Sequence, residues 1–367
     1  MMTVVRSAFL APLLLVLLLA ACSDDDDAGP PVTEPLASTP PSTNEAPPLN
    51  TQAATRATPA ATPTPAVVPT SIPPQEGKPP IVDMHFHPDS FWDIGALVQL
   101  MGELGVRQAV GGSGDSGVEA LQFAAAYPDH FIPFAGQDGL RALNLIQGAA
   151  SWNLQSDESL AYLSSLEAQL QAGCWAGIGE IFLNTQSSHV SGGFSVPTDT
   201  PLMRRLLALS AGYDAPLSVH MDAAPASVEG LRSLLTSNSD GTIIWAHAGW
   251  YAEPDLLHDL LATHPNLYIE TSFRDELRSF FPVSADGVLN AEWRALIEEM
   301  PDRFVLGTDL NPPPTPQKYS ELISFWRDVL DQLPPETAAM VAQENAERLI
   351  GDRAPADAEA CIAMLGG

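Results

Sequence analysis

The sequence predicts an α/β fold, a (β/α)8 TIM barrel over residues 79–351. Two observations predict it. Short apolar runs alternate with longer segments of helical periodicity through this part of the chain, and eight such strand-then-helix units are typical of a barrel of this kind. Polar side chains also recur where the apolar runs end, and these ends form the active-site face of such barrels.

The elements of this barrel are expected in regular alternation. The expected strands are the apolar runs at residues 80–86, 106–111, 131–136, 177–183, 215–221, 242–248, 267–272 and 304–309. The expected helices are the periodic segments at residues 93–104, 116–127, 157–172, 199–212, 226–236, 254–263, 290–299 and 317–331. A doubly wound open sheet is the alternative, but no Gly-rich phosphate loop follows the first strand. The weak likeness at Gly111-Gly-Ser-Gly114 is interpreted as a flexible turn.

The segment before the barrel predicts a targeting signal followed by a spacer. Residues 1–21 contain Arg6 and then an apolar stretch too short for a comfortable membrane span, which is typical of a secretory signal peptide. The ending Leu19-Ala-Ala-Cys22 resembles a bacterial lipobox, which implies lipidation of Cys22; an ordinary signal peptide is the alternative. Residues 22–78 are rich in Asp, Thr and Pro and lack apolar periodicity, so we expect a disordered tether. A lipoprotein of the cell envelope, outside the cytoplasm, is the resulting hypothesis.

Charge and cysteine content exclude some classes of protein. The chain carries 45 acidic and 16 basic residues, a formal net charge of −29, so nucleic acid would be repelled and is not expected as a partner. Three cysteines are too few for a disulfide scaffold. Cys174 and Cys361 either pair or are buried as small apolar residues, and the sequence leaves both alternatives open.

Candidate metal ligands end several of the expected strands. His85 and His87 lie two residues apart, so on a strand both side chains point to the same side and can converge on one ion. Four more candidates end later strands: Glu180, His220, His247 and Asp309. Imidazole and carboxylate ligands suit Zn²⁺, with Mn²⁺ or Fe²⁺ as further options, and require no thiolate.

Five short motifs carry a family resemblance. They are Val82-Asp-Met-His-Phe-His87, Ile178-Gly-Glu180-Ile, Val219-His220, Trp245-Ala-His247-Ala-Gly249 and Leu306-Gly-Thr-Asp309. In this order they resemble the amidohydrolase superfamily of metal-dependent TIM-barrel hydrolases, in particular the amidohydrolase-2 branch. The segment from Glu344 to Leu349 looks like the C-terminal helix of that family, and residues 352–367 are then a C-terminal tail.

The resemblance implies a chemistry. His85, His87 and Asp309 would hold a first metal, and His220 and His247 a second or part of a single site. Glu180 would bridge two ions, as in binuclear relatives. Asp309 would be the base that accepts a proton from a metal-activated water, and the substrate would be a small amide, ester, lactone or phosphoester.

Two other functions stay open at this stage. One is a non-oxidative decarboxylase of the same superfamily, for which the resemblance implies a single metal, often without a ligand at the position of Glu180. The other is a non-catalytic surface lipoprotein that binds a metal or a ligand. Family barrels often dimerise, so a homodimer is a further expectation. Three residues after strand ends are candidate substrate contacts: Arg274, His189 and Trp250. Arg274 could instead pair with a neighbouring acidic side chain, and the other two could be solvated or packed under the loops.

Overall fold

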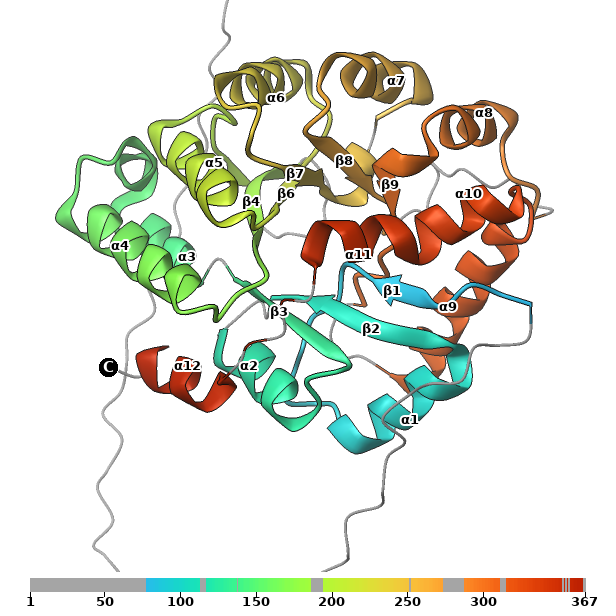
Figure 1. Cartoon of the computed structure of the whole chain (residues 1–367). Helices are drawn as coiled ribbons and strands as arrows, with labels where there is room; N and C mark the ends of the chain where they lie inside the picture. Colours follow the sequence, from blue (N-terminus) through green and yellow to red (C-terminus); the bar gives the residue numbers. More distant parts are fainter. Residues whose placement is uncertain are drawn as a thin grey trace, which may run out of the picture. The chain divides into compact units, whose positions relative to one another are not determined.

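The predicted strands form a single curved sheet in the computed structural model of the chain (Figure 1). The strands of its main path are β1 (Ile81–Asp83), β2 (Val106–Gly111), β3 (Phe131–Ala135), β4 (Gly177–Thr185), β6 (Leu217–Met221), β7 (Ile243–Trp245), β8 (Leu267–Glu270) and β9 (Phe304–Val305). Neighbours follow the order of the chain and every pair on this path is parallel. A short additional strand, β5 (Phe194–Ser195), pairs with β4 in the antiparallel direction.

The structure describes residues 77–112, 117–136, 138–185, 194–250, 252–272, 287–310, 315–351, 353, 355 and 357–365. The predicted signal peptide, Cys22 and nearly all of the predicted tether lie outside these residues. Within them, no helix is both long enough and apolar enough to cross a membrane.

Two backbone hydrogen bonds join the first strand to the last. Beyond β1, the Met84 N–H donates to the Leu306 carbonyl at 2.8 Å, and beyond β9 the Asp309 N–H donates to the His85 carbonyl at 2.7 Å. Both bonds lie at the carboxyl ends of the strands, where the candidate ligands are. The two ends of the sheet path therefore meet, as the predicted barrel requires.

Helices follow the strands and cover the sheet (Figure 1). They are α1 (Ile94–Leu104), α2 (Gly117–Ala126), α3 (Asp138–Gln147), α4 (Asp157–Gln171), α5 (Pro201–Tyr213), α6 (Pro225–Ser237), α7 (Pro254–Thr263), α8 (Ala291–Glu299), α9 (Pro316–Leu330), α10 (Pro335–Ala339), α11 (Asn345–Ile350) and α12 (Ala358–Leu365). The shorter helical turns are η1 (Gly148–Asn153), η2 (Ala246–Gly249), η3 (Pro301–Arg303) and η4 (Met340–Glu344).

Local sequence signals explain where several helices begin. The side chains of Asp93, Ser156, Thr200 and Thr315 each accept a hydrogen bond from a backbone N–H in the first turn of the following helix. Apolar residues of each helix then pack on the sheet. In α5, for example, Leu202, Leu206 and Leu207 are completely buried. The eight predicted helices are all present, whereas α3, α10 and α12 were not predicted as helices.

The C-terminal segment is attached to the barrel. The predicted tail contains α12, which packs beside α2. Cys361 of α12 forms a disulfide with Cys174, which lies between α4 and β4. Of the two alternatives that the sequence left open for these cysteines, the structure shows the disulfide.

Candidate metal centre

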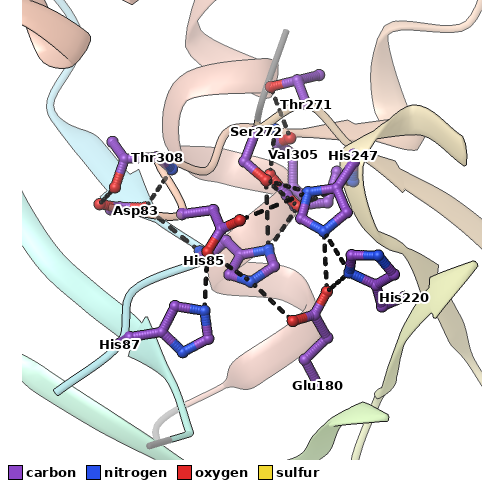
Figure 2. A network of polar contacts seen from close by, with 12 residues as sticks. Asp83, His85, His87, Glu180, His220, His247, Thr271, Ser272, Val305 and Thr308 are labelled. Carbon is purple, nitrogen blue, oxygen red and sulfur yellow. Dashed lines mark hydrogen bonds and ion pairs between the residues drawn. The ribbon is translucent and has the colours of Figure 1, made fainter. Parts of the chain in front are cut away.

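Six polar side chains from five strand ends meet at one end of the barrel, and Figure 2 labels His85, His87, Glu180, His220 and His247 among them. They are the predicted ligands His85, His87, Glu180, His220, His247 and Asp309. Glu180 and His220 lie within β4 and β6, while the other four follow their strands rather than ending them. Strands β1, β7 and β9 are shorter than predicted because their ladders stop before these residues, whose backbone turns into the mouth of the barrel.

Two of these residues have unusual backbone conformations. His247 has φ 58° and Asp309 has φ 43°, both in the left-handed region that non-glycine residues rarely adopt. Such conformations persist only where the surrounding structure imposes them, and they cluster at functional sites. In this chain they turn both side chains towards the other candidate ligands.

The imidazole of His87 is in direct contact with the carboxylate of Asp309. The Nε2 of His87 lies 2.8 Å from Asp309 Oδ1, and its Nδ1 lies 3.1 Å from the carbonyl oxygen of Gly112. A carbonyl only accepts, so Nδ1 carries a proton and donates to it. In the neutral imidazole, Nε2 is therefore the nitrogen that presents a lone pair to the centre, which is the form that binds a metal.

Glu180 links the histidines on the two sides of the centre. Its Oε1 lies 3.0 Å from His220 Nδ1 and 2.9 Å from His247 Nε2. Its Oε2 lies 3.4 Å from His85 Nε2. One carboxylate thus faces His220 and His247 with one oxygen and His85 with the other.

The donor atoms fit a divalent transition metal. His220 Nδ1 and His247 Nε2 are 2.9 Å apart, so with Glu180 Oε1 they form a triangle with edges of 2.9 to 3.0 Å. Donor atoms this close together could all reach one ion at bond lengths of about 2.0–2.1 Å. A second group of donors comes from His85, His87 and Glu180, with ligand atoms within 4.8 Å of one another. His85 Nε2 is buried between Glu180 and Asp309 without the geometry of a hydrogen bond to a described residue.

Electrostatics keep both carboxylates of the centre ionised. Burial by itself would raise the pKa of Glu180, but the charges of His85 and His220 outweigh it and hold that pKa well below its usual range. The pKa of Asp309 is likewise lowered to about 2, because the histidines around it outweigh the effect of burial. For His85 the directions are reversed: burial lowers its pKa, but the charges of Glu180 and Asp309 outweigh burial. They raise the pKa of His85 well above 6.5. A metal that binds here would therefore displace a proton.

Asp83 lies beside the centre but serves the fold. Its carboxylate accepts hydrogen bonds from the Thr308 N–H at 2.9 Å, the Thr308 hydroxyl at 2.7 Å and the Tyr319 hydroxyl at 3.2 Å. These contacts tie β1 to the segment after β9 and to α9. Burial raises the pKa of Asp83 to about 6, and its hydrogen bonds to Thr308 oppose this shift.

Sequence reasoning missed two polar residues behind the histidines. Glu270 ends β8 and accepts a hydrogen bond from His85 Nδ1 at 2.8 Å, and Ser272 lies 2.8 Å from His247 Nδ1. Both lie in the strand predicted at 267–272, where a signal was available. A carboxylate inside an otherwise apolar run, followed two residues later by another polar side chain on the same side, indicates a buried polar contact.

The candidate substrate contacts are placed only in part. Trp250 is half-buried directly after η2, and its ring centroid lies 5.9 Å from that of His247, nearly perpendicular to it. Arg274 and His189 lie outside the described residues. Trp250 therefore lies beside a candidate ligand, and the other two residues remain predictions.

A parallel β/α barrel with four histidines and two carboxylates gathered at its strand ends is an arrangement typical of metal-dependent enzymes. The amidohydrolase family model matches residues 82–351, and the chain belongs to this family. It is therefore an enzyme of the amidohydrolase type, from a superfamily that generally binds divalent metals.

Comparison with solved structures agrees with the fold. An uncharacterised TIM-barrel protein from Bordetella bronchiseptica is 18% identical, with a TM-score of 0.51 over 74% of this chain and 99% of that chain. A 2,6-dihydroxybenzoate decarboxylase from Rhizobium is 15% identical, covering 74% of this chain and 98% of that chain at a TM-score of 0.43. A dihydroorotase from Campylobacter jejuni is 16% identical, covering 74% and 82% at a TM-score of 0.42. The first similarity concerns the fold alone, and the other two are too weak to carry an argument. A search of curated proteins found no match.

Proposed function

We propose that this protein is a metal-dependent hydrolase of small amides, esters, lactones or phosphoesters, with a binuclear centre. The observation that carries the proposal is the position of Glu180, whose two oxygens face histidines on opposite sides of the centre. A carboxylate placed in this way suits two ions that share one ligand. The same observation favours hydrolysis over non-oxidative decarboxylation, for which the sequence resemblance implied a single metal without this ligand.

The six residues divide into two ligand groups around Glu180. His85, His87 and Asp309 would hold the first ion, and His220 and His247 the second. The mixture of imidazole and carboxylate donors suits Zn²⁺ best and also accepts Mn²⁺ or Fe²⁺. A bound ion of this kind supplies a Lewis acid and lowers the pKa of a coordinated water towards 7.

Asp309 has the geometry of a base. Its Oδ1 faces His87 Nε2 at 2.8 Å, while Oδ2 lies 3.9 Å from His247 Nδ1, beyond hydrogen-bond distance. Because its pKa is lowered to about 2, the carboxylate is ionised at neutral pH and can accept a proton at Oδ2. We therefore assign to Asp309 the transfer of a proton from the attacking water to the leaving group.

Substrate contacts are proposed around this centre. Trp250 would provide an aromatic wall beside His247, because its ring lies against that histidine. The guanidinium of Arg274 would bind a carboxylate or phosphate of the substrate, and His189 would be a further contact.

Metal removal tests the proposed hydrolase. The full-length protein, reconstituted with Zn²⁺, Mn²⁺ or Fe²⁺, would be assayed with a panel of small amides, esters, lactones and phosphoesters. We expect turnover of at least one class, its loss after EDTA treatment and its return on adding metal. Turnover that survives complete removal of the metal, verified by elemental analysis, would contradict the proposal. Release of CO₂ from a carboxylated substrate without hydrolysis would instead indicate the decarboxylase.

We also propose that the enzyme is a lipoprotein outside the cytoplasm, anchored through Cys22. The disulfide between Cys174 and Cys361 supports this location, because such bonds persist in oxidising compartments and are rare in the cytosol. Labelling cells with a palmitate analogue should mark the wild-type protein and leave Cys22→Ala unlabelled. Equal labelling of both proteins, or of neither, would refute the anchor.

A further inference from the structure

Glu270 is a completely buried carboxylate behind the metal centre. It ends β8, the strand between those that carry His247 and Asp309, and only 1% of its surface is exposed. It belongs to none of the groups of candidate ligands among the described residues. A buried carboxylate needs donors around it, and the identity of these donors indicates what Glu270 does.

Three donors converge on one oxygen of Glu270. His85 Nδ1 lies 2.8 Å from Oε2, the Ser272 hydroxyl 2.8 Å and the backbone nitrogen of His247 3.3 Å from the same atom. The other oxygen, Oε1, accepts a hydrogen bond from the Ser272 N–H. The Ser272 hydroxyl and both backbone N–H groups donate, so the two oxygens of Glu270 act as acceptors, and we assign the proton of the remaining contact to His85 Nδ1.

The direction of the hydrogen bond between His85 and Glu270 determines which nitrogen of His85 presents its lone pair to the centre. Because Nδ1 donates to Glu270, the neutral imidazole of His85 has its lone pair on Nε2. That nitrogen is the one directed at Glu180 and Asp309, at 3.4 Å and 3.6 Å.

Ser272 orients the ring of His247 in the same way, through its hydroxyl group. Its hydroxyl donates to Glu270, so its oxygen can accept from His247 Nδ1, which lies 2.8 Å away (Figure 2). With its proton on Nδ1, His247 presents the lone pair of Nε2, the atom 2.9 Å from Glu180 Oε1. One carboxylate thus orients a histidine on each side of the centre, directly in one case and through a hydroxyl in the other.

Glu270 is packed closely against the backbone at Gly307. A Cβ atom placed on Gly307 would lie 2.2 Å from Glu270 Oε1 and 2.6 Å from the Cβ of His85. Glycine at this position therefore allows the carboxylate to lie against the backbone of the segment after β9, beside His85.

We propose that Glu270 is a positioning residue that holds His85 and His247 in the form that binds metal at Nε2, with Ser272 as the relay to His247. The proposal rests on the proposed metal centre, and it assigns one shared support to both ligand groups. It predicts unequal effects of two variants: Glu270→Gln disturbs both histidines, whereas Ser272→Ala disturbs His247 most. The Ser272 hydroxyl also lies 3.3 Å from His85 Nδ1, but this nitrogen keeps its shorter contact of 2.8 Å with Glu270.

Nitrogen-15 NMR of the histidine rings tests the proposal without activity and without metal. The chain has eight histidines, so the full-length protein with labelled histidine gives few resonances. In the wild type we expect Nδ1–H protons of His85 and His247 that are protected from exchange with water. Ser272→Ala should remove this protection at His247 and keep it at His85, and Glu270→Gln should reduce it at both. A uniform change at all histidines would indicate a general loss of structure and would overturn the proposal.

Thr271→Val provides the matched control. Thr271 lies between the two residues, is similarly buried and uses its hydroxyl for the Val305 carbonyl at 3.3 Å rather than for a histidine. This variant should lose a buried hydrogen bond while leaving both Nδ1–H signals unchanged. If Thr271→Val changed the Nδ1–H signals as much as Ser272→Ala does, the hydrogen bonds from Glu270 through Ser272 to His247 would have no specific role.

Metal affinity provides the second measurement. Competition with a chelator should show a loss of about 10- to 100-fold in Zn²⁺ affinity for Glu270→Gln, the usual range for residues that orient metal ligands, and no change for Thr271→Val. Wild-type affinity in a folded Glu270→Gln variant would overturn the proposal. If the wild type bound no metal, the proposed function would fail, while the NMR result would still decide whether Glu270 orients the two histidines.

Discussion

Asp309→Asn is expected to reduce kcat by about 10²- to 10⁴-fold, the usual contribution of a positioned acid or base. Asparagine has the same shape and keeps an oxygen at the position of Oδ1, which lies 2.8 Å from His87 Nε2. Its amide nitrogen cannot take up a proton in place of Oδ2. The variant therefore separates the transfer of a proton from the geometry of the site. The measurement is kcat for the best substrate of the panel, with the metal content of the same sample determined in parallel.

The metal content makes the result decisive. If Asp309→Asn keeps its metal and loses turnover, the residue acts as the base. A variant with full metal and unchanged kcat would contradict this assignment. Loss of metal together with turnover would show that Asp309 is needed as a ligand, and its function as a base would then lack support.

Glu180→Gln is expected to lower the metal content from two ions per chain to one. The amide keeps one oxygen but loses the charge with which the carboxylate faces histidines on both sides of the centre. Turnover should fall by about 100-fold or more, since even residues that only orient metal ligands contribute about 10- to 100-fold. Elemental analysis gives the stoichiometry, and anomalous scattering locates the ions that remain.

Asp309→Asn serves as the control for this experiment, because it removes a charge from the same centre while leaving Glu180 in place. It should retain more metal than Glu180→Gln. A wild-type enzyme with a single ion and Glu180 unbound would refute the binuclear centre and favour the decarboxylase.

Much of the fold was predictable because its signal is local. Apolar runs such as 106–111 and 217–221 carry the strand pattern in a few consecutive residues, and the helices between them begin at residues that cap them, such as Ser156 and Thr200. The ends of β1 and β7 were predicted too long for the same reason: apolar residues continue past the point where the ladder ends. Hydrogen bonding between strands, not hydrophobicity, determines where a strand stops.

The candidate site was predictable as a set, because a parallel barrel brings the carboxyl ends of its strands together. This rule was enough to group His85 with Asp309, although most of the barrel sequence lies between them. It did not identify Glu270 or Ser272, because a carboxylate inside an apolar run indicates a buried polar contact but not which side chains it contacts.

The sequence alone determined the alternation of strands and helices, the pair of histidines at His85 and His87, and the types of ligand at the later strand ends. Only the tertiary structure decided which atoms face each other. It directs the two oxygens of Glu180 to different histidines, places Glu270 behind His85 and pairs Cys174 with Cys361. The physical reason is that periodicity reports the side on which a residue lies, whereas its partner depends on strand register and on the closure of β1 against β9.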